Sequence, residues 1–137
     1  MIEKPKNTFY LPIPPEVEQI GKTVLDAAFK IHTALGPGLL ESVYEGCLAY
    51  ELTKSGADVE TQVALPVLYE DVRIESGLRL DMLVDKSVIV EIKAVEKLIA
   101  LHEAQLLTYL RISDLRLGYL INFNTLRLKD GIKRMVR

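Results

Sequence analysis

Two carboxylates and a lysine, Asp81, Glu91 and Lys93, stand in a stretch whose alternation predicts a β-hairpin. Apolar residues recur at every second position on both sides of residues 85–87, which is typical of two antiparallel strands joined by a short loop. If Val84 lies opposite Val88, Asp81 lies opposite Glu91. The same register pairs Met82 with Val90, Leu83 with Ile89, Leu80 with Ile92 and Arg79 with Lys93. We therefore expect one apolar face and, on the other face, two carboxylates followed by two cations.

Opposed carboxylates need compensation, because directly paired side chains have Cβ atoms about 4.5–5.5 Å apart and like charges repel there. A divalent hard cation that bridges Asp81 and Glu91 would supply it. A neighbouring Arg79 or Lys93 would also supply it, without any catalytic role. Glu91 and Lys93 are two apart and share a face of the strand. A metal-activated nucleophile beside a fixed positive charge is what phosphodiester hydrolysis requires, so the spacing indicates such a site or an ion-paired surface.

Helical segments precede and follow this hairpin. From Glu16 to Leu35 apolar residues recur in steps of three and four, which predicts an amphipathic helix ended by Gly-Pro-Gly at 36–38. A second helix is expected to stop at Gly56, and a third is predicted over 97–112. The residues expected to face inward on the second helix are Leu40, Val43, Tyr44, Cys47, Leu48 and Leu52.

The remaining segments predict a sheet. Residues 59–69 alternate with a period of two, and Pro66 among them favours an edge strand or a bulge. Residues 70–78 are expected to form a turn and a short connection, and 117–123 a buried strand. The predicted order is ααβββαβ with a C-terminal hairpin. This is a mixed α/β fold whose central sheet has strands of mixed direction and is flanked by helices.

Composition restricts the class of protein. The 137 residues and 15.4 kDa fit one core, and we expect an extended, proline-punctuated arm over 1–15 and a single domain over 16–137. The hydrophobic content of 49% excludes bulk disorder, and the apolar runs are too short to span a bilayer. The N-terminal stretch lacks the apolar segment of a secretory signal. A single cysteine, Cys47, excludes an intrachain disulfide and a cysteine-based zinc site, which favours a cytoplasmic protein.

Charge is concentrated at the C-terminus. The segments 125–129 and 132–136 flank Asp130-Gly131, a dipeptide typical of hairpin turns. The surrounding residues are a solvated surface or a rim that faces phosphates, with Lys133 and Arg134 as the expected nucleic-acid contacts. The basic residues here are Arg127, Lys129, Lys133, Arg134 and Arg137, against one acid, Asp130.

These motifs resemble a known family. An Asp at 81, nine further residues and then Glu-Ile-Lys at 91–93 resemble the core motif of the PD-(D/E)XK nuclease superfamily. Residues 38–44, GLLESVY, are similar to the G-x-x-E-x-x-Y signature of the GxxExxY family, which is generally assigned to that superfamily. Leu80 stands where the superfamily's name has Pro, and Asn124 where relatives often have Gly. Other matching segments are 36–38, 79–81, 91–98, 102–105 and 120–123, so the resemblance covers residues 30–136.

The resemblance implies a PD-(D/E)XK nuclease-like core, which is the core of restriction endonucleases, and a divalent-metal site. Glu41 resembles the acid carried by a helix, Asp81 the metal-binding Asp and Glu91 the second metal carboxylate. These side chains would hold one or two Mg²⁺ or Mn²⁺ ions. The carbonyl of Ile92 would add a ligand.

The resemblance also implies the groups that act on the substrate. Lys93 resembles the catalytic lysine, which would orient the attacking water and offset charge on the scissile phosphate. Gln105 and Tyr109 resemble the Q-x-x-x-Y motif of the exonuclease-like branch. Being four apart, they share a helical face, from which they would steady Lys93 or touch a phosphate.

Structural alternatives remain for individual residues. Glu41 near a helix start would also be favoured by the helix dipole. Gln105 with Tyr109 would equally form a surface pair. Tyr44 and Cys47 are expected in the core, His102 on a helix surface or lining the site, and His32 at a helix end or packed.

Two functions from different classes therefore remain. The intact acids and lysine favour a metal-dependent nuclease that acts on DNA or RNA. The net charge of −2 and the pI near 5.7 favour a catalytically silent module that binds nucleic acid or protein on the same fold. In either case a second copy of the chain or a protein partner would supply substrate recognition.

Overall fold

The first two helices form a pair at the N-terminal side of the fold. The computed structural model describes residues 11–137, so most of the expected N-terminal arm lies outside the described residues. Helix α1, Pro15–Leu35, begins with a proline that suits the first turn and carries Glu16 and Glu18 near its positive end. It ends at Gly36, whose φ of +70° is natural for glycine. Helix α2, Glu41–Lys54, follows a five-residue connection at 36–40.

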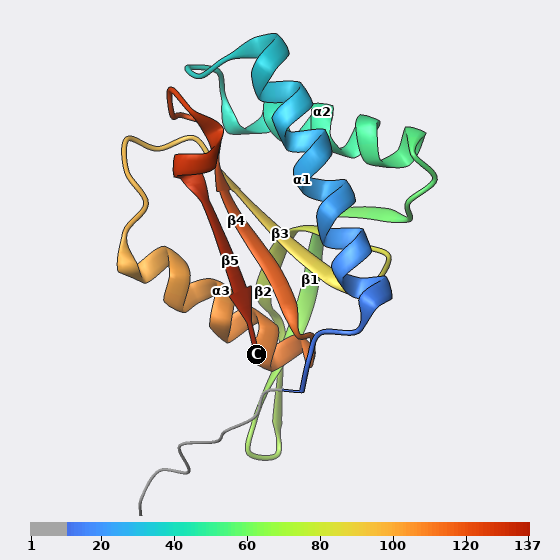
Figure 1. The fold of residues 1–137 in the computed structure, drawn as a ribbon. Coiled ribbons are helices and arrows are strands. Elements are labelled where there is room, and N and C mark those ends of the chain that lie inside the picture. The colour runs from blue at the N-terminus through green and yellow to red at the C-terminus, as the bar shows by residue number, and fades with distance from the viewer. Residues whose placement is uncertain (1–10) are drawn as a thin grey trace, which may run out of the picture.

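A five-stranded sheet follows the spatial order β1-β2-β3-β4-β5 (Figure 1). Three of the four neighbouring pairs are antiparallel, and β3 and β4 are parallel. Parallel strands need a crossover connection, which here contains α3, Ala100–Ser113. The strands are β1 Val59–Tyr69, β2 Val72–Val84, β3 Val88–Lys93, β4 Leu117–Asn122 and β5 Ile132–Val136.

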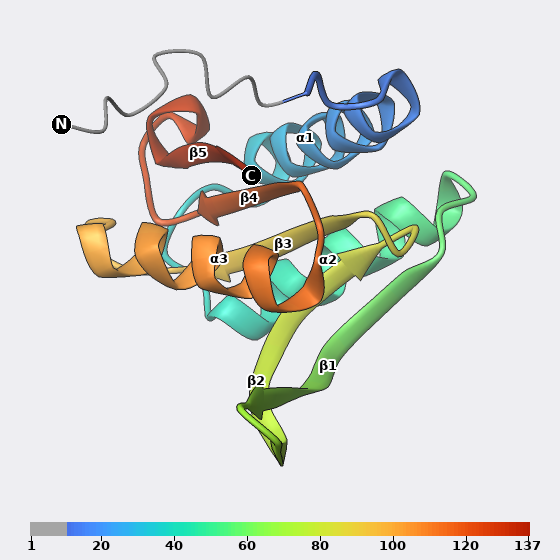
Figure 2. The same ribbon diagram turned by 90° about the horizontal axis from the view of Figure 1, so that it is seen from below.

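Helices cover both faces of the sheet, as Figure 2 shows for α1 and α3. On one face, α1 and α2 pack against the sheet in a core that includes Tyr44 and Phe123. On the other face, Leu106 and Leu110 of α3 pack against Leu80. The β1–β2 ribbon extends beyond the rest of the sheet (Figure 1). The predicted mixed α/β fold with a mixed sheet flanked by helices is thus confirmed.

Several local predictions are also confirmed. The β2–β3 register places Val84 opposite Val88 and Met82 opposite Val90, as alternation predicted. Strand β1 is an edge strand, and its register with β2 shifts between Leu65 and Val67, around the proline. No helix within residues 11–137 is long and apolar enough to cross a membrane.

Other local predictions are wrong. Residues 72–78 belong to β2 and are not a connection, because they extend the ribbon with β1. The C-terminal hairpin is also absent from the described chain: η1, Leu128–Gly131, is a 3-10 helix, and β5 pairs with β4. The third helix begins at Ala100 and not at 97. Leu40 precedes α2 and is exposed. On α2, Val43 is exposed and Cys47 is half-buried, because the helix buries only the stripe of Tyr44, Leu48 and Leu52.

Candidate active site

The sheet splits at Asp81 and Glu91. The regular pairing of β2 with β3 ends at Met82 and Val90. Beyond that pair, the Asp81 N–H donates to Glu91 Oε2 at 2.8 Å, and the Ile92 N–H donates to Asp81 Oδ2 at 2.8 Å. Each carboxylate thus accepts a hydrogen bond from the opposite strand's main chain, which satisfies groups that the ladder no longer pairs. These bonds hold the two carboxylates side by side.

The split corrects the predicted pairing beyond Met82. Asp81 and Glu91 are joined through their carboxylates and are not ladder partners, and two further predicted pairs are absent. Leu80 and Ile92 do not face each other, because Leu80 packs in the core beneath α3 while Ile92 packs in the core beneath α1 and α2. Arg79 pairs with Ala64 of β1 and not with Lys93. Beyond Asp81, β2 follows β1 into the projecting ribbon, whereas β3 stays paired with β4.

Glu91 is the most perturbed acid in the described chain. Its side chain is only 4% exposed. The pKa of Glu91 is raised to about 8, mainly by burial and next by the negative charge of Asp81. The hydrogen bond from Asp81 and the charge of Lys93 oppose this rise, while Glu41 adds to it. A positive charge placed here would therefore favour the ionised carboxylate.

Glu41 is positioned by the turn that precedes α2. The Tyr44 hydroxyl donates to the Gly36 carbonyl at 2.6 Å and accepts the Leu39 N–H at 3.1 Å. The Tyr44 ring is fully buried and stacks on Phe123, with centroids 4.5 Å apart. These contacts fix the start of α2, so that Glu41, its first residue, is presented beside the sheet. Tyr44 is therefore a core residue, as predicted.

Glu41 and Asp81 line one small polar cavity of about 200 Å³. The cavity lies between α2 and the split in the sheet, and Ile92 of β3 contributes to its wall. Because Ile92 donates its N–H toward Asp81, its carbonyl faces the same edge of β3. The remaining residues on the wall are Ser42, Glu45 and Gln62.

Lys93 is the last residue of β3 and is half-buried. It is opposite Asn122 of β4, a polar residue that is 1% exposed. The Asn122 side chain accepts the Val95 N–H at 3.1 Å and donates to the Val95 carbonyl at 2.9 Å. This pair of bonds fixes the chain directly after Lys93. Within residues 11–137 Lys93 forms no ion pair, and its positive charge lowers the pKa of Glu91.

The two residues of the predicted Q-x-x-x-Y pattern lie on α3. Tyr109 is half-buried, and its pKa is raised by burial and by the charges of Glu91 and Asp81. Gln105 is exposed one turn earlier and forms no side-chain hydrogen bond with the described residues. Tyr109 thus belongs to the surroundings of the carboxylates, while Gln105 lies at the surface.

The two histidines hold the ends of helices, and the basic residues of β5 lie at the surface. His102 Nδ1 accepts the Ile99 N–H at 3.1 Å, which caps the start of α3. His32 Nε2 donates to the Thr125 carbonyl at 2.8 Å and joins the end of α1 to the chain after β4. On β5, Arg134 forms an ion pair with Glu18 at 2.7 Å, while Lys133 is exposed.

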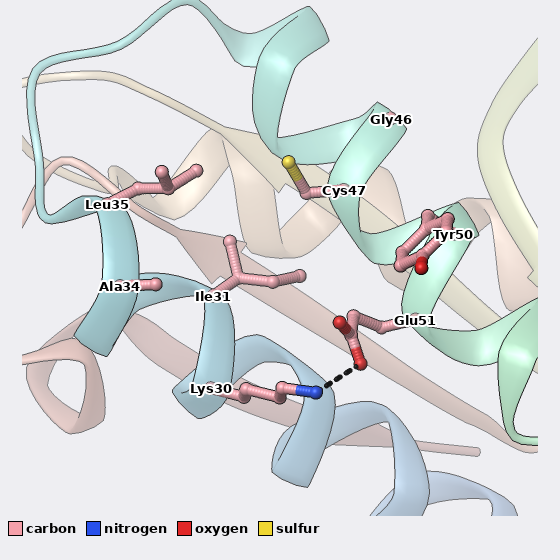
Figure 3. A pocket seen from close by; sticks show the side chains of 8 residues that line it. All are labelled: Lys30, Ile31, Ala34, Leu35, Gly46, Cys47, Tyr50 and Glu51. Carbon is pink, nitrogen blue, oxygen red and sulfur yellow. Dashed lines mark hydrogen bonds and ion pairs between the residues drawn. The ribbon is translucent and has the colours of Figure 1, made fainter.

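A larger cavity of about 310 Å³ lies between α1 and α2, away from the carboxylates (Figure 3). Its wall is mostly apolar and includes Cys47, and the Lys30–Glu51 ion pair of 3.0 Å crosses one end. The residues predicted to do chemistry lie elsewhere, so this cavity does not contribute to the site.

A family profile described as "PD-(D/E)XK nuclease superfamily" matches residues 18–135. The chain belongs to the PD-(D/E)XK nuclease superfamily. The five-stranded mixed sheet and its flanking helices are consistent with the nuclease-like fold of that superfamily. The chain matches no curated protein and no solved structure.

Nucleases of the PD-(D/E)XK superfamily generally depend on a divalent metal, which takes oxygen ligands. Within residues 11–137 no three His, Cys, Asp or Glu side chains are arranged to hold an ion by themselves. Mg²⁺, however, usually binds one or two carboxylates and keeps several waters. The hydrogen bonds between the strands use Asp81 Oδ2 and Glu91 Oε2 and leave the second oxygen of each carboxylate for a ligand. The adjacent pair therefore fits a hydrated Mg²⁺.

Sequence reasoning missed two residues on the cavity wall, Glu45 and Gln62. The Gln62 amide donates to Glu45 Oε1 at 2.7 Å. Burial raises the pKa of Glu45, the Gln62 hydrogen bond lowers it, and the charges of Asp81 and Glu41 raise it. The signal available in the sequence was the spacing of Glu41 and Glu45, which are four apart and so share a helical face. Nothing in the alternation of 59–69 distinguished Gln62.

Proposed function

We propose that this chain is a metal-dependent nuclease that hydrolyses phosphodiester bonds in DNA or RNA. The observation that supports this most strongly is the joined pair of carboxylates, Asp81 and Glu91, with Lys93 on the same strand as Glu91. A buried acid beside a second acid lowers the stability of the fold. A chain that keeps such a pair is therefore expected to use its charge. In a PD-(D/E)XK member that use is a divalent cation.

Glu41, Asp81 and Glu91, together with the carbonyl of Ile92, are the groups that we assign to Mg²⁺ or Mn²⁺. When bound, such an ion activates water and neutralises charge on a phosphate. Glu41 lines the same cavity as Asp81, and its charge acts on Glu91, which supports its place in this set. Glu91 must lose its proton to bind a cation, and its raised pKa makes that step dependent on pH.

Lys93 is assigned to the substrate. Its ammonium group orients the attacking water and offsets the negative charge that gathers on the phosphate as the new P–O bond forms and the leaving oxygen departs. Tyr109 and Gln105 are placed on α3 to contact a phosphate or to steady Lys93. The Tyr109 hydroxyl lies in the field of the two carboxylates, which favours a role near the site.

We further assign the chain to the GxxExxY family within the superfamily. The bonds from Tyr44 to Gly36 and Leu39 give a physical reason for that signature, because the tyrosine ties the glycine turn to the helix that carries Glu41. Gly38, the first residue of the signature, has a φ of +99°. An L side chain rarely adopts this conformation, which gives a reason for glycine at that position.

The test is a titration of Mg²⁺ and of Mn²⁺ against a panel of single- and double-stranded DNA and RNA. The proposal expects cleavage of at least one polymer that requires the metal and is lost in Asp81→Asn. A wild-type protein that binds a polymer but cleaves none at any metal concentration would favour the silent module instead. In that case, the same panel repeated with a protein partner added would show whether the partner supplies recognition of the substrate.

A further inference from the structure

Gln62 has an unusual backbone conformation for a residue inside a strand. Its φ is +52°, in the left-handed region that non-glycine residues rarely occupy. The register is unchanged across it, since Thr61 pairs with Met82 and Val63 with Leu80. Gln62 is therefore no inserted residue, and by this register it lies directly opposite Asp81.

The other left-handed, non-glycine residues of the described chain lie in turns, at a helix end or at a change of register. Ser76 is the only other one within a strand, and it lies where β1 and β2 shift register. The remaining four are Glu70, Asp85, Lys86 and Asp114. Of the described residues, Gln62 alone has this conformation within a strand at unchanged register, and the β1–β2 ladder lacks its pair with Asp81 there. Such departures cost energy and concentrate at functional sites.

The side chain of Gln62 reaches the cavity that Asp81 lines. It donates through Nε2 to Glu45 Oε1 at 2.7 Å and so joins β1 to α2 across that cavity. Glu45 lies one helical turn after Glu41 and is half-buried. The bond holds the Glu45 carboxylate on the wall, facing the acids of the proposed site.

We propose that Gln62 and Glu45 are positioning residues of this site, where Gln62 holds Glu45 to accept hydrogen bonds from the waters of a cation bound at Asp81. The inference rests on the proposed metal-dependent function. Mg²⁺ keeps several of its waters, and groups that orient a metal's ligands or waters change its affinity by about 10- to 100-fold. Glu45 therefore acts through water, and Gln62 acts through Glu45.

Two variants separate this role from a structural one. Gln62→Gly removes the amide but suits the left-handed backbone, so the fold is retained. Glu45→Gln keeps an acceptor for the Gln62 amide but removes the charge. Ser76→Gly is the matched control, because it relieves the same backbone conformation in the projecting ribbon, outside the cavity.

Binding of Mg²⁺ is measured by calorimetry on each protein without nucleic acid, and cleavage is measured against Mg²⁺ concentration. We expect Gln62→Gly and Glu45→Gln to bind Mg²⁺ about tenfold or more weakly and to need correspondingly more for cleavage. Ser76→Gly should match the wild type. Wild-type affinity in both cavity variants would overturn the inference.

The same data distinguish failure of the inference from failure of the proposed function. If the wild type binds Mg²⁺ but cleaves no polymer, the nuclease proposal fails alone, and the affinities of the two cavity variants still decide the role of Gln62 and Glu45. If the wild type binds no divalent cation, both fail.

Discussion

At Asp81 and Glu91, each carboxylate accepts a hydrogen bond that a strand partner's carbonyl would otherwise accept. This explains how two acids can lie together in a largely dry place, because the N–H groups of Asp81 and Ile92 stabilise one oxygen of each. It does not remove the cost of the buried charge, since burial still raises the pKa of Glu91 to about 8. The site is therefore stable with a proton on Glu91 or with a cation beside it.

The first prediction concerns pH. In the metal-free protein Glu91 keeps its proton up to about pH 8, whereas in the unfolded chain it ionises near 4.5. Between these values the native state binds more protons, so the free energy of unfolding falls as pH rises, by on the order of a few kcal/mol. Denaturant titrations of the wild type and Glu91→Gln from pH 4.5 to 8 measure this. The variant should lose most of the slope, and equal slopes would refute the burial of a protonated Glu91.

The second prediction concerns metal. Mg²⁺ binds only the folded arrangement of carboxylates, so it should raise the melting temperature, with a stabilisation of about 2.7 kcal/mol at one hundred times the dissociation constant. Asp81→Asn should abolish the shift while retaining the hydrogen bond from Ile92, because an amide oxygen also accepts. The same melting temperature with excess metal and with chelator would contradict a metal site in the free protein.

The elements bring these residues together from four places. Strands β2 and β3 supply the carboxylates and Lys93, α2 supplies Glu41, and α3 supplies Tyr109. The positions of these residues depend on local hydrogen bonds, such as that of the Tyr44 hydroxyl before α2 and that of the Asn122 amide after β3. The site therefore depends on buried polar bonds as much as on apolar packing.

The variant Tyr44→Phe tests the hydrogen bonds of the Tyr44 hydroxyl. The change leaves the Leu39 N–H and the Gly36 carbonyl without their partner, which should cost about 1–3 kcal/mol of stability by denaturant titration. It should also lower cleavage, because Glu41 begins the helix that this bond fixes. Tyr50→Phe is the control, since Tyr50 is 63% exposed on the same helix. A Tyr44→Phe protein as stable and active as that control would show that the turn needs no such bond.

Over the whole molecule, the alternation and periodicity of apolar residues were sufficient to predict the regular helices and strands. They predicted α1, because apolar and polar residues separate cleanly there, and the register from Val84 to Met82, because the short loop at 85–87 fixes which residues face each other. They failed at Leu80, because only the tertiary fold determines where the sheet divides between its two cores. Residues 72–78 also escaped prediction, because Ser76 and Gly77 interrupt the alternation of the strand and the projecting ribbon is exposed over residues 72–77.

The residues of the candidate site could be named from the sequence, but their arrangement could not. Asp81, Glu91 and Lys93 followed from spacing, and Glu41 from a motif. Gln62 could not be found, because a left-handed backbone inside a strand has no sequence signature. Asp130-Gly131 resembled a hairpin turn, whereas Gly131 is required because a side chain there would collide with the Asn122 carbonyl.

Because the overall charge is −2, binding of nucleic acid has to rely on local basic groups. If β5 contacts phosphates, Lys133→Ala should weaken binding and reduce the slope of log K against log salt by about 1. Arg134→Ala should change the slope less, because its charge is paired with Glu18. Lys22→Ala on α1 is the control. An unchanged slope in Lys133→Ala would identify this segment as a solvated surface only.

The most direct test of the central claim is the rate of Mg²⁺-dependent cleavage by Lys93→Ala. We predict a folded protein with cleavage reduced by about 100-fold or more, because this charge acts where the phosphate gathers negative charge. Lys97→Ala, an exposed lysine four residues later, should retain the wild-type rate. Wild-type cleavage by Lys93→Ala would contradict the account and point to a contaminating nuclease or another site.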